Sequence, residues 1–200
     1  MKVAVLDYAV GNLFSISNAL RRLGAEPTVT SDPRLLEEAD AVVLPGVGSF
    51  PAAAARIAPV AGLLRRLARE KPVLGVCLGM QLFFQSSLEG GRETPGLSLL
   101  PGRVVPLPPR VKGPHMGWNT VHPVAPSRLL EGVPGDSYFY FVHSYYADTA
   151  GGHVVATTRY GVEFPSVVET PPLYGTQFHP EKSGRLGLKV LGNFLGEAKR

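Results

Sequence analysis

Residues 72–81 read Pro-Val-Leu-Gly-Val-Cys-Leu-Gly-Met-Gln, and this stretch decides the predicted fold. The apolar run before the cysteine is typical of a buried strand, and a helix is expected over 78–85. Gly75 and Gly79 flank Cys77 at a distance of two residues, which is the nucleophile-elbow pattern with cysteine in place of serine. Because small residues let the strand and the helix approach each other, Cys77 is predicted to project from the carboxyl edge of a sheet.

Outward from this stretch, predicted strands and helices alternate through the first half of the chain. Apolar runs predict strands, and apolar residues three or four positions apart predict helices. Strands are expected over 2–6, 25–30, 41–44 and 72–76, and helices over 13–23, 32–39 and 50–69, the last interrupted near Pro59. This alternation predicts a parallel sheet that is covered on both faces.

The second half has a different character. Residues 87–114 are rich in glycine and proline and are interpreted as loop, with one strand near 103–107. Short β segments are expected over 138–146, 153–160, 166–170 and 173–178, and a last helix over 184–198. The predicted fold class is therefore α/β, with a largely parallel central sheet flanked by helices on both faces and an added antiparallel β portion in the second half. Without an internal repeat or a long linker, residues 1–200 are expected to form a single domain.

Composition narrows the class of protein. With 44% hydrophobic and 18% charged residues, the 200 residues can bury a core. A single cysteine cannot form an internal disulfide, and no apolar run is long enough to span a membrane, so a reducing cytoplasm is the expected location. The net charge of +4 comes from scattered basic residues, which gives little support to nucleic-acid binding.

Cys77 has two interpretations. As a nucleophile it lies at a helix N-terminus, where the dipole favours a thiolate, and the N–H of Leu78 points toward a developing oxyanion. The alternative is a buried cysteine in an ordinary strand–turn–helix unit, since free cysteine is among the most buried residue types.

A thiol nucleophile needs a base, and the base needs a group that orients it. Of five histidines, only His179 ends an apolar strand and is followed two positions later by an acid, Glu181. If the chain stays extended through Pro180, both side chains face the same side, so Glu181 can accept a hydrogen bond from one imidazole nitrogen while the other faces Cys77. The alternative is a loop histidine beside a solvated glutamate.

The turn over 45–48, Pro-Gly-Val-Gly, follows a predicted parallel strand and lies at the same sheet edge. Its glycines allow the backbone to direct N–H groups at a ligand, so the N–H of Val47 or Gly48 is the candidate second oxyanion donor. A phosphate loop is the competing interpretation, but neither the P-loop nor the dinucleotide pattern is present.

At this point the motifs "GVCLGMQ", "PGVGSF" and "FHPEKS", in this order, resemble class I (triad-type) glutamine amidotransferases over nearly the whole chain. The segments "DYAVGNLFSI" (7–16), "PHMGWN" (114–119) and "YFVHSYY" (140–146) are similar to the glutaminase subunits of imidazole glycerol phosphate synthases. The order Cys, His, Glu differs from the nucleophile, acid, His order of α/β-hydrolases.

The resemblance implies a reaction and the residues that carry it. The cysteine attacks the side-chain amide of glutamine, the histidine relays the proton, ammonia leaves, and water hydrolyses the γ-glutamyl thioester. The implied triad is Cys77, His179 and Glu181. The implied oxyanion amides are those of Val47, Gly48 and Leu78, and the implied glutamine contacts are Gly46, Gln81, His143, Ser144 and Tyr145. No cofactor is implied, and one cysteine with dispersed histidines gives no metal-ligand cluster.

The resemblance also implies a partner. The chain has no room for a second catalytic domain, so the ammonia is expected to pass to a separate (β/α)8-barrel cyclase that forms a heterodimer with it in histidine biosynthesis. Met116 and Trp118 are candidate apolar anchors of that interface, although core packing is an equally good explanation of the tryptophan. The resemblance places Asn12, Asn119 and Lys182 near the interface too.

Two further functions stay open on the sequence alone. One is another amidase or a cysteine peptidase on the same fold, and the other is a redox-sensing protein without enzymatic activity. For the glutaminase, a peptide flip in the turn Gly46-Val47-Gly48 is a plausible switch that completes the oxyanion hole when the partner binds.

Overall fold

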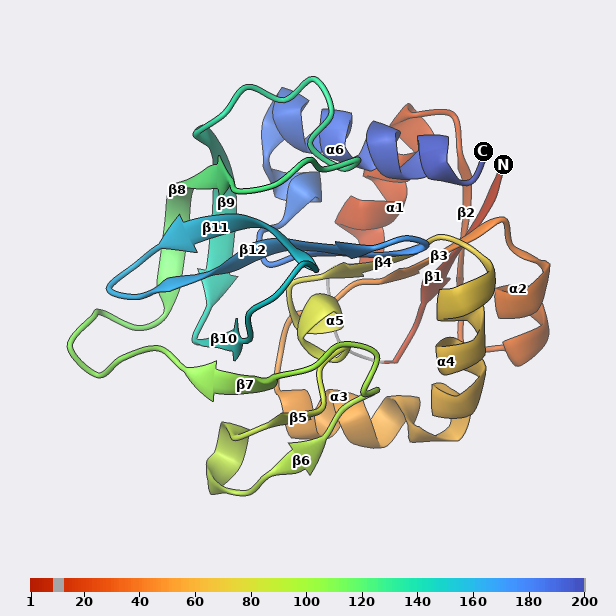
Figure 1. Cartoon of the computed structure of the whole chain (residues 1–200). Coiled ribbons are helices and arrows are strands. Elements are labelled where there is room, and N and C mark those ends of the chain that lie inside the picture. Colours follow the sequence, from red (N-terminus) through yellow and green to blue (C-terminus); the bar gives the residue numbers. More distant parts are fainter. Residues whose placement is uncertain (9–12, 200) are drawn as a thin grey trace.

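The computed structural model describes residues 1–8 and 13–199, and it confirms the α/β class (Figure 1). The strands are β1 (Lys2–Leu6), β2 (Glu26–Thr30), β3 (Ala41–Leu44), β4 (Val73–Val76), β5 (Ser86–Ser87), β6 (Thr94–Pro95), β7 (Arg103–Pro106), β8 (His115–Pro123), β9 (Ser137–His143), β10 (Tyr145–Asp148), β11 (Val154–Arg159), β12 (Glu163–Thr170) and β13 (Leu173–Thr176). The helices are α1 (Leu13–Arg22), α2 (Pro33–Glu38), α3 (Phe50–Ile57), α4 (Ala61–Glu70), α5 (Leu78–Gln81) and α6 (Gly184–Glu197), and the 3-10 turns are η1 (Ala58–Val60), η2 (Glu89–Gly91) and η3 (Pro180–Lys182).

The larger sheet has the strand order β2-β1-β3-β4-β13-β12-β11-β8-β9. Its first five strands run parallel, and β12, β11, β8 and β9 extend it in antiparallel fashion. Val76 of β4 lies opposite Thr176 of β13, and Leu44 of β3 lies opposite Gly75. Because parallel strands end at a common edge, the chain segments that follow β3, β4 and β13 emerge beside one another.

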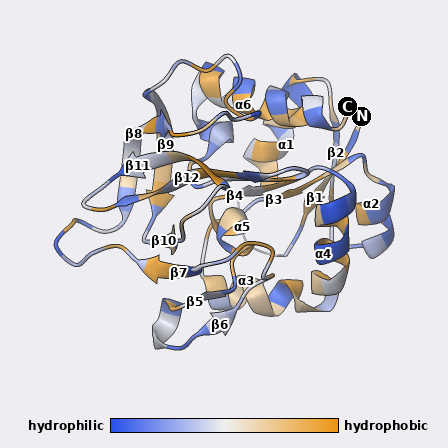
Figure 2. Cartoon of the chain, viewed as in Figure 1, coloured by the Kyte–Doolittle hydropathy of each residue, from blue (hydrophilic) through white to orange (hydrophobic). Residues whose placement is uncertain are grey.

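Helices cover both faces of the parallel strands, as the alternation predicted. Val3 and Val5 pack toward α1 and α6 on one face, whereas Ala4 and Leu6 pack toward α2, α3, α4 and α5 on the other. The apolar positions of α4 show the reason, because Leu64, Leu67 and Ala68 are buried while the arginines between them face solvent. Figure 2 shows the same division, with hydrophobic residues along the central strands and hydrophilic residues on the outward side of α4.

The structure departs from several local expectations. The helix expected over 78–85 ends at Gln81, because the amides of Phe83 and Phe84 donate to carbonyls three positions earlier and the amide of Gln85 donates to the carbonyl of Gly102 instead of that of Gln81. The loop expected over 87–114 contains the predicted strand at β7, but it also contributes β6 to a second, four-stranded sheet of order β10-β7-β5-β6. Strand β8, for which the sequence suggested no element, is nine residues long.

The strand expected over 138–146 is divided at Ser144. Its first part, β9, belongs to the larger sheet, and its second part, β10, pairs with β7 in the smaller sheet. The carbonyl of Ser144 accepts a hydrogen bond from the Leu107 amide at 2.9 Å, which holds this junction between the two sheets.

Among the described residues, no helix is long and apolar enough to cross a membrane.

Candidate active site

Cys77 forms a strained turn between β4 and α5. Its φ of 53° and ψ of −107° lie in a region that residues with a side chain rarely adopt. A Cβ on Gly79 would overlap the carbonyl oxygen of Leu44, and one on Gly75 would lie 2.6 Å from the amide nitrogen of Met80. Both flanking positions therefore require glycine, which is the physical content of the predicted elbow.

His179 and Glu181 lie behind Cys77 at the same edge of the sheet. The amide of Cys77 donates to the carbonyl of Thr176 at 2.7 Å, so the segment that leads to His179 runs beside the elbow. His179 is only 2% exposed, and its Nδ1 lies 2.8 Å from Oε1 of Glu181, whose side chain is 4% exposed. Nδ1 donates this hydrogen bond, which leaves Nε2 as the atom that can exchange a proton with substrate.

The two side chains meet by a different backbone path from the one expected. The chain does not stay extended after His179 but forms the 3-10 turn η3. Pro180 occupies the first position of this turn, where its fixed φ and missing N–H suit a helical turn. The amide of Lys182 donates to the carbonyl of His179, and Ser183 Oγ donates to the same carbonyl at 2.6 Å, so Glu181 is turned back toward the imidazole.

The charges of the site favour an imidazolium at position 179. Burial lowers the pKa of His179, but the negative charge of the Cys77 thiolate and the hydrogen bond to Glu181 outweigh burial and raise the pKa to about 10. The Nε2 of His179 is buried, and the Cys77 side chain interacts with the imidazole. Burial and the charge of Cys77 raise the pKa of Tyr8, whose hydroxyl donates to the Pro45 carbonyl.

The predicted oxyanion residues lie together, but one donor is occupied. The amide of Leu78 donates to the carbonyl of Gly46 at 3.4 Å. Gly48 has a φ of 119°, which only glycine adopts readily, and Val47 is half-buried beside it. In this conformation a carbonyl oxygen of the turn, rather than an N–H, faces the Leu78 amide.

A pocket of about 310 Å³ lies beside Cys77, and His179 and Glu181 are not among its lining residues. Eight predicted site residues line it, namely Val47, Gly48, Cys77, Leu78, Gln81, His143, Ser144 and Tyr145. Gly46 is not among the lining residues and contributes through its carbonyl bond to Leu78. The amide Nε2 of Gln81 donates to the Tyr145 carbonyl at 2.8 Å and to Oε1 of Gln177 at 3.0 Å, so internal bonds already fix this side chain.

The sequence interpretation missed two polar residues of the site. Glu89 lines the pocket, and its Oε2 accepts a hydrogen bond at 2.8 Å from the Phe50 amide at the start of α3. Gln177 donates from Nε2 to Sγ of Cys77 at 3.4 Å. A lone acid in a glycine-rich loop carries no local signal, whereas the position of Gln177 two residues before His179 could have suggested it.

The predicted interface residues differ in their exposure. Met116 and Trp118 on β8 are 63% and 55% exposed, so the tryptophan is not a core residue. The Nζ of Lys182 lies 5.9 Å above the ring centre of Tyr140, which contacts Trp118 edge-on. Asn12 lies outside the described residues.

Asn119, the remaining predicted interface residue, is half-buried. Its amide is bonded within the chain, to Nε2 of His115 at 3.2 Å and to the carbonyl of Arg159 at 3.1 Å.

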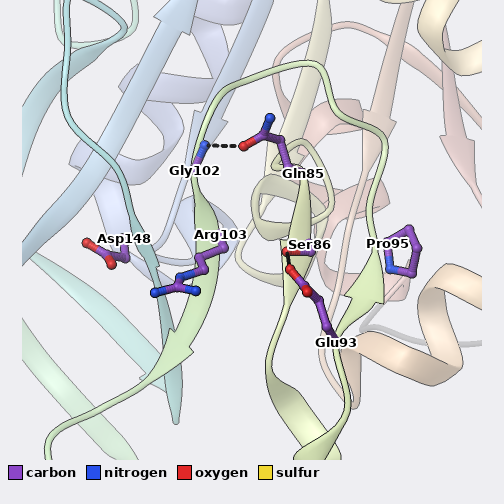
Figure 3. A pocket seen from close by; sticks show the side chains of 7 residues that line it. All are labelled: Gln85, Ser86, Glu93, Pro95, Gly102, Arg103 and Asp148. Carbon is purple, nitrogen blue, oxygen red and sulfur yellow. Dashed lines mark hydrogen bonds between the residues drawn. The ribbon is translucent and has the colours of Figure 1, made fainter.

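A second hollow, of about 650 Å³, lies along the smaller sheet (Figure 3). It is lined by Gln85, Ser86, Glu93, Pro95, Gly102, Arg103 and Asp148, none of which the sequence singled out. Several of its polar groups already have partners, because Oε1 of Gln85 accepts from the Gly102 amide and Ser86 Oγ donates to Glu93. The residues within 1–8 and 13–199 contain no group of three potential metal ligands at this hollow or elsewhere.

Comparisons with known proteins found similarity over nearly the whole chain. The family model described as glutamine amidotransferase class-I matches residues 4–198. The imidazole glycerol phosphate synthase subunit HisH of Methanothermobacter thermautotrophicus is 52% identical over 197 residues, which cover 96% of this chain and 97% of that protein. The protein of the same name from Archaeoglobus fulgidus is 49% identical over 199 residues, covering 99% and 100% of the two chains.

Solved structures share the fold at lower identity. A structure titled glutamine amidotransferase has a TM-score of 0.77 at 21% identity and covers 99% of both chains. A structure of PurLQS from Thermotoga maritima has a TM-score of 0.77 at 19% identity, covering 98% of this chain and 97% of that one.

Proposed function

The chain belongs to the class-I glutamine amidotransferase family, and we infer from this that it is the glutamine-hydrolysing subunit of an imidazole glycerol phosphate synthase in histidine biosynthesis. The observation that best supports this function is the buried pair of His179 and Glu181, 2.8 Å apart, behind a strained cysteine at the rim of a pocket. A thiol, an imidazole and a carboxylate in this order are the parts of a nucleophilic triad.

The chemistry follows from these positions. The Cys77 thiolate attacks the Cδ carbon of glutamine, and the carbonyl oxygen becomes an oxyanion. The His179 imidazolium gives its Nε2 proton to the amide nitrogen, so ammonia leaves and a γ-glutamyl thioester remains. A water molecule then gives a proton to His179 as its oxygen attacks the thioester, and glutamate and the thiolate are released. Glu181 keeps the imidazole in one orientation and stabilises its charged form.

Glu89 is suited to bind the α-ammonium group of the substrate. Its carboxylate lies at the pocket wall and is fixed by the Phe50 amide, so little side-chain entropy is lost when a cation binds. A carboxylate that pairs with a free ammonium group favours glutamine itself over glutamine within a peptide chain. This argues against the cysteine peptidase that the sequence left open.

The oxyanion hole is proposed to exist in two states. The carbonyl oxygen of Gly46 and the N–H of Val47 belong to the same peptide group. In this conformation the oxygen accepts a hydrogen bond from the Leu78 amide, so the Val47 N–H points in the opposite direction. A flip of the peptide between Gly46 and Val47 would exchange that oxygen for the Val47 N–H and free the Leu78 N–H. Since a missing oxyanion donor costs roughly 100- to 1,000-fold in kcat, the chain alone is expected to be nearly idle.

The ammonia is proposed to pass to a (β/α)8-barrel cyclase that forms a heterodimer with this chain in the cytoplasm. Support comes from the exposed aromatic and thioether side chains on β8 and β9, where Met116, Trp118 and Tyr138 are each more than half exposed. Large apolar side chains with this exposure are typical of a protein interface. Residues 1–200 are proposed to act as one glutaminase domain.

The decisive experiment uses the chain in complex with a candidate cyclase. Cys77→Ala is expected to abolish glutamine-dependent turnover, while added ammonium salt still drives the cyclase reaction. A glutamine-analogue chloroketone is expected to label wild-type Cys77 once per chain. If both activities disappear in Cys77→Ala, or if the chloroketone fails to label a correctly assembled complex, the glutaminase assignment is wrong.

A further inference from the structure

Two buried histidines that take no part in the triad contact each other between β8 and β9. His115 begins β8, His143 ends β9, and the two residues lie opposite each other in the sheet register. They are 3% and 6% exposed, and Nδ1 of His115 lies 2.9 Å from Nε2 of His143. The ring of His115 stacks on the rings of Tyr160 and Phe141, at centroid distances of 4.1 and 4.9 Å, so its orientation is fixed.

The partners of the two rings determine where each proton lies. Nδ1 of His143 is 2.9 Å from the carbonyl oxygen of Tyr145, and a carbonyl only accepts, so this Nδ1 carries the proton. Nε2 of a neutral His143 is then an acceptor, and it must receive the Nδ1 proton of His115. Nε2 of His115 is in turn an acceptor for the Asn119 amide at 3.2 Å. These three hydrogen bonds therefore all have the same direction, with donors on the side of Asn119 and the Tyr145 carbonyl as the last acceptor.

The direction requires two neutral rings, and their surroundings provide this. Burial lowers the pKa of His115 to about 4. Burial also lowers the pKa of His143 to about 3; the bond to the Tyr145 carbonyl opposes the shift, and the nearby His115 and His179 add to it. At neutral pH each imidazole thus carries a proton on only one of its two nitrogens, as the three hydrogen bonds require.

Further hydrogen bonds connect the Tyr145 carbonyl to the catalytic sulfur. The Tyr145 carbonyl accepts from Gln81 as well as from His143, and Gln81 also donates to Gln177. Gln177 donates to Sγ of Cys77. Tyr145 and Gln81 line the pocket, so the position of one carbonyl affects both the pocket wall and the group that contacts the thiolate.

We propose that Asn119, His115 and His143 form a directional hydrogen-bond relay that ties β8 to the Tyr145 carbonyl and so positions the wall of the glutamine pocket. The proposal rests on the function inferred above. Strand β8 carries Met116 and Trp118 on its exposed side and the relay on its buried side. A cyclase that docks on β8 therefore acts on a strand that is hydrogen-bonded to the pocket wall.

Two matched variants of His115 separate the hydrogen bond from the packing. Leucine and asparagine have nearly the same shape, and both lose the stacked ring, but the side-chain nitrogen of asparagine stands close to the place of Nδ1. His115→Asn therefore keeps a donor for His143, and His115→Leu leaves Nε2 of His143 without one. In the complex with the cyclase, the KM for glutamine is expected to be about tenfold higher in His115→Leu than in His115→Asn, with ammonia-dependent turnover equal in the two.

Nuclear magnetic resonance of imidazole ¹⁵N nuclei tests the proton positions without any assay of activity. In the wild-type chain, the resonances of His115 and His143 are expected to show a protonated Nδ1 and an unprotonated Nε2. In His115→Leu, the resonances of His143 are expected to shift, because its Nε2 loses a donor. His122→Leu, which removes an exposed histidine from the same strand, is the control and is expected to leave the His143 resonances in place.

The outcomes are distinct. A proton on Nε2 of His143 would overturn the relay, and so would equal glutamine KM values in the leucine and asparagine variants. Either result would do so even if Cys77→Ala loses glutamine-dependent turnover and keeps ammonia-dependent turnover, as the proposed function requires. Conversely, the ¹⁵N spectra could show the expected tautomers while Cys77→Ala still hydrolyses glutamine. The hydrogen bonds would then be confirmed, but the glutaminase function on which their role depends would be refuted.

Discussion

Acidification from pH 7 to pH 5 tests the burial of His115 and His143 as neutral rings. The folded pKa of each is lowered, to about 4 and about 3, whereas an unfolded imidazole has a pKa of about 6.5. Below pH 6.5 the unfolded chain therefore binds protons that the folded chain does not, and the free energy of unfolding falls as the pH falls. The stabilising contribution is fully present above pH 6.5 and is lost progressively down to the folded pKa.

The magnitude follows from the distance between pH 5 and the unfolded pKa. That distance is about 1.5 pH units, and each unit corresponds to about 1.36 kcal/mol, so each histidine accounts for about 2 kcal/mol and the pair for about 4 kcal/mol. Urea denaturation at pH 7, 6 and 5 measures the loss. His115→Leu is expected to lose about 2 kcal/mol less than the wild type over this range. His122→Leu is the matched control.

Equal losses in wild type and His115→Leu would refute the reasoning, because they would mean that His115 binds a proton in the folded chain or is not buried. Groups that titrate in both proteins cancel in the comparison. The exception is His143, whose pKa is lowered partly by His115. In His115→Leu, the part of the pH-dependent loss of stability that comes from His143 is therefore expected to be slightly smaller.

Three further predictions concern the triad, the elbow and the docking surface. Glu181→Gln is expected to lower glutamine-dependent kcat/KM about 100-fold, since a charged hydrogen-bond partner of the buried imidazolium is lost, and ammonia-dependent turnover serves as the control; a loss below about threefold contradicts the assigned role. Gly79→Ala is expected to lower the free energy of unfolding by at least about 3 kcal/mol, because the new Cβ overlaps the Leu44 carbonyl. By contrast, a Cβ at Gly192 in α6 would have its nearest contact at 3.9 Å, so Gly192→Ala is expected to raise the free energy of unfolding by up to about 1 kcal/mol. Similar shifts of the melting temperature in Gly79→Ala and Gly192→Ala would argue against the packing explanation. Trp118→Ala is expected to weaken cyclase binding at least about tenfold in calorimetric titration while the melting temperature of the isolated chain is unchanged; full affinity would exclude this face.

Local chemistry made much of the fold predictable. The elbow at Cys77 could be identified because only glycine fits the two flanking positions, and a pattern that sterics impose is visible in a single sequence. Strands β1, β3 and β4 were predicted because they are buried on both faces and read as largely continuous apolar runs, whereas β2 at the edge of the sheet is mostly exposed. The proximity of Cys77 and His179 could be predicted because β4 and β13 are parallel neighbours that end at one edge.

The remaining features depend on contacts between distant segments. Strand β8 escaped prediction because its more buried face carries His115, Gly117 and Asn119, whereas its exposed face carries Met116 and Trp118. Hydrophobicity therefore does not follow burial along this strand, and the usual apolar alternation is absent from the sequence. Glu89 escaped because its role depends on the amide of Phe50, 39 positions away in the chain. The occupied Leu78 amide could not be predicted either, since a peptide orientation leaves no trace in residue identity.

The junction at Ser144, where the chain passes from one sheet to the other, has a consequence for what the protein tolerates. Side chains alternate along β10, with Ala147 fully buried and Asp148 exposed. One residue more or fewer at the junction would reverse this alternation and turn a carboxylate into the space that a methyl group fills. At Ser144, which lines the pocket beside Cys77, the protein should therefore tolerate a change of residue better than a change of length.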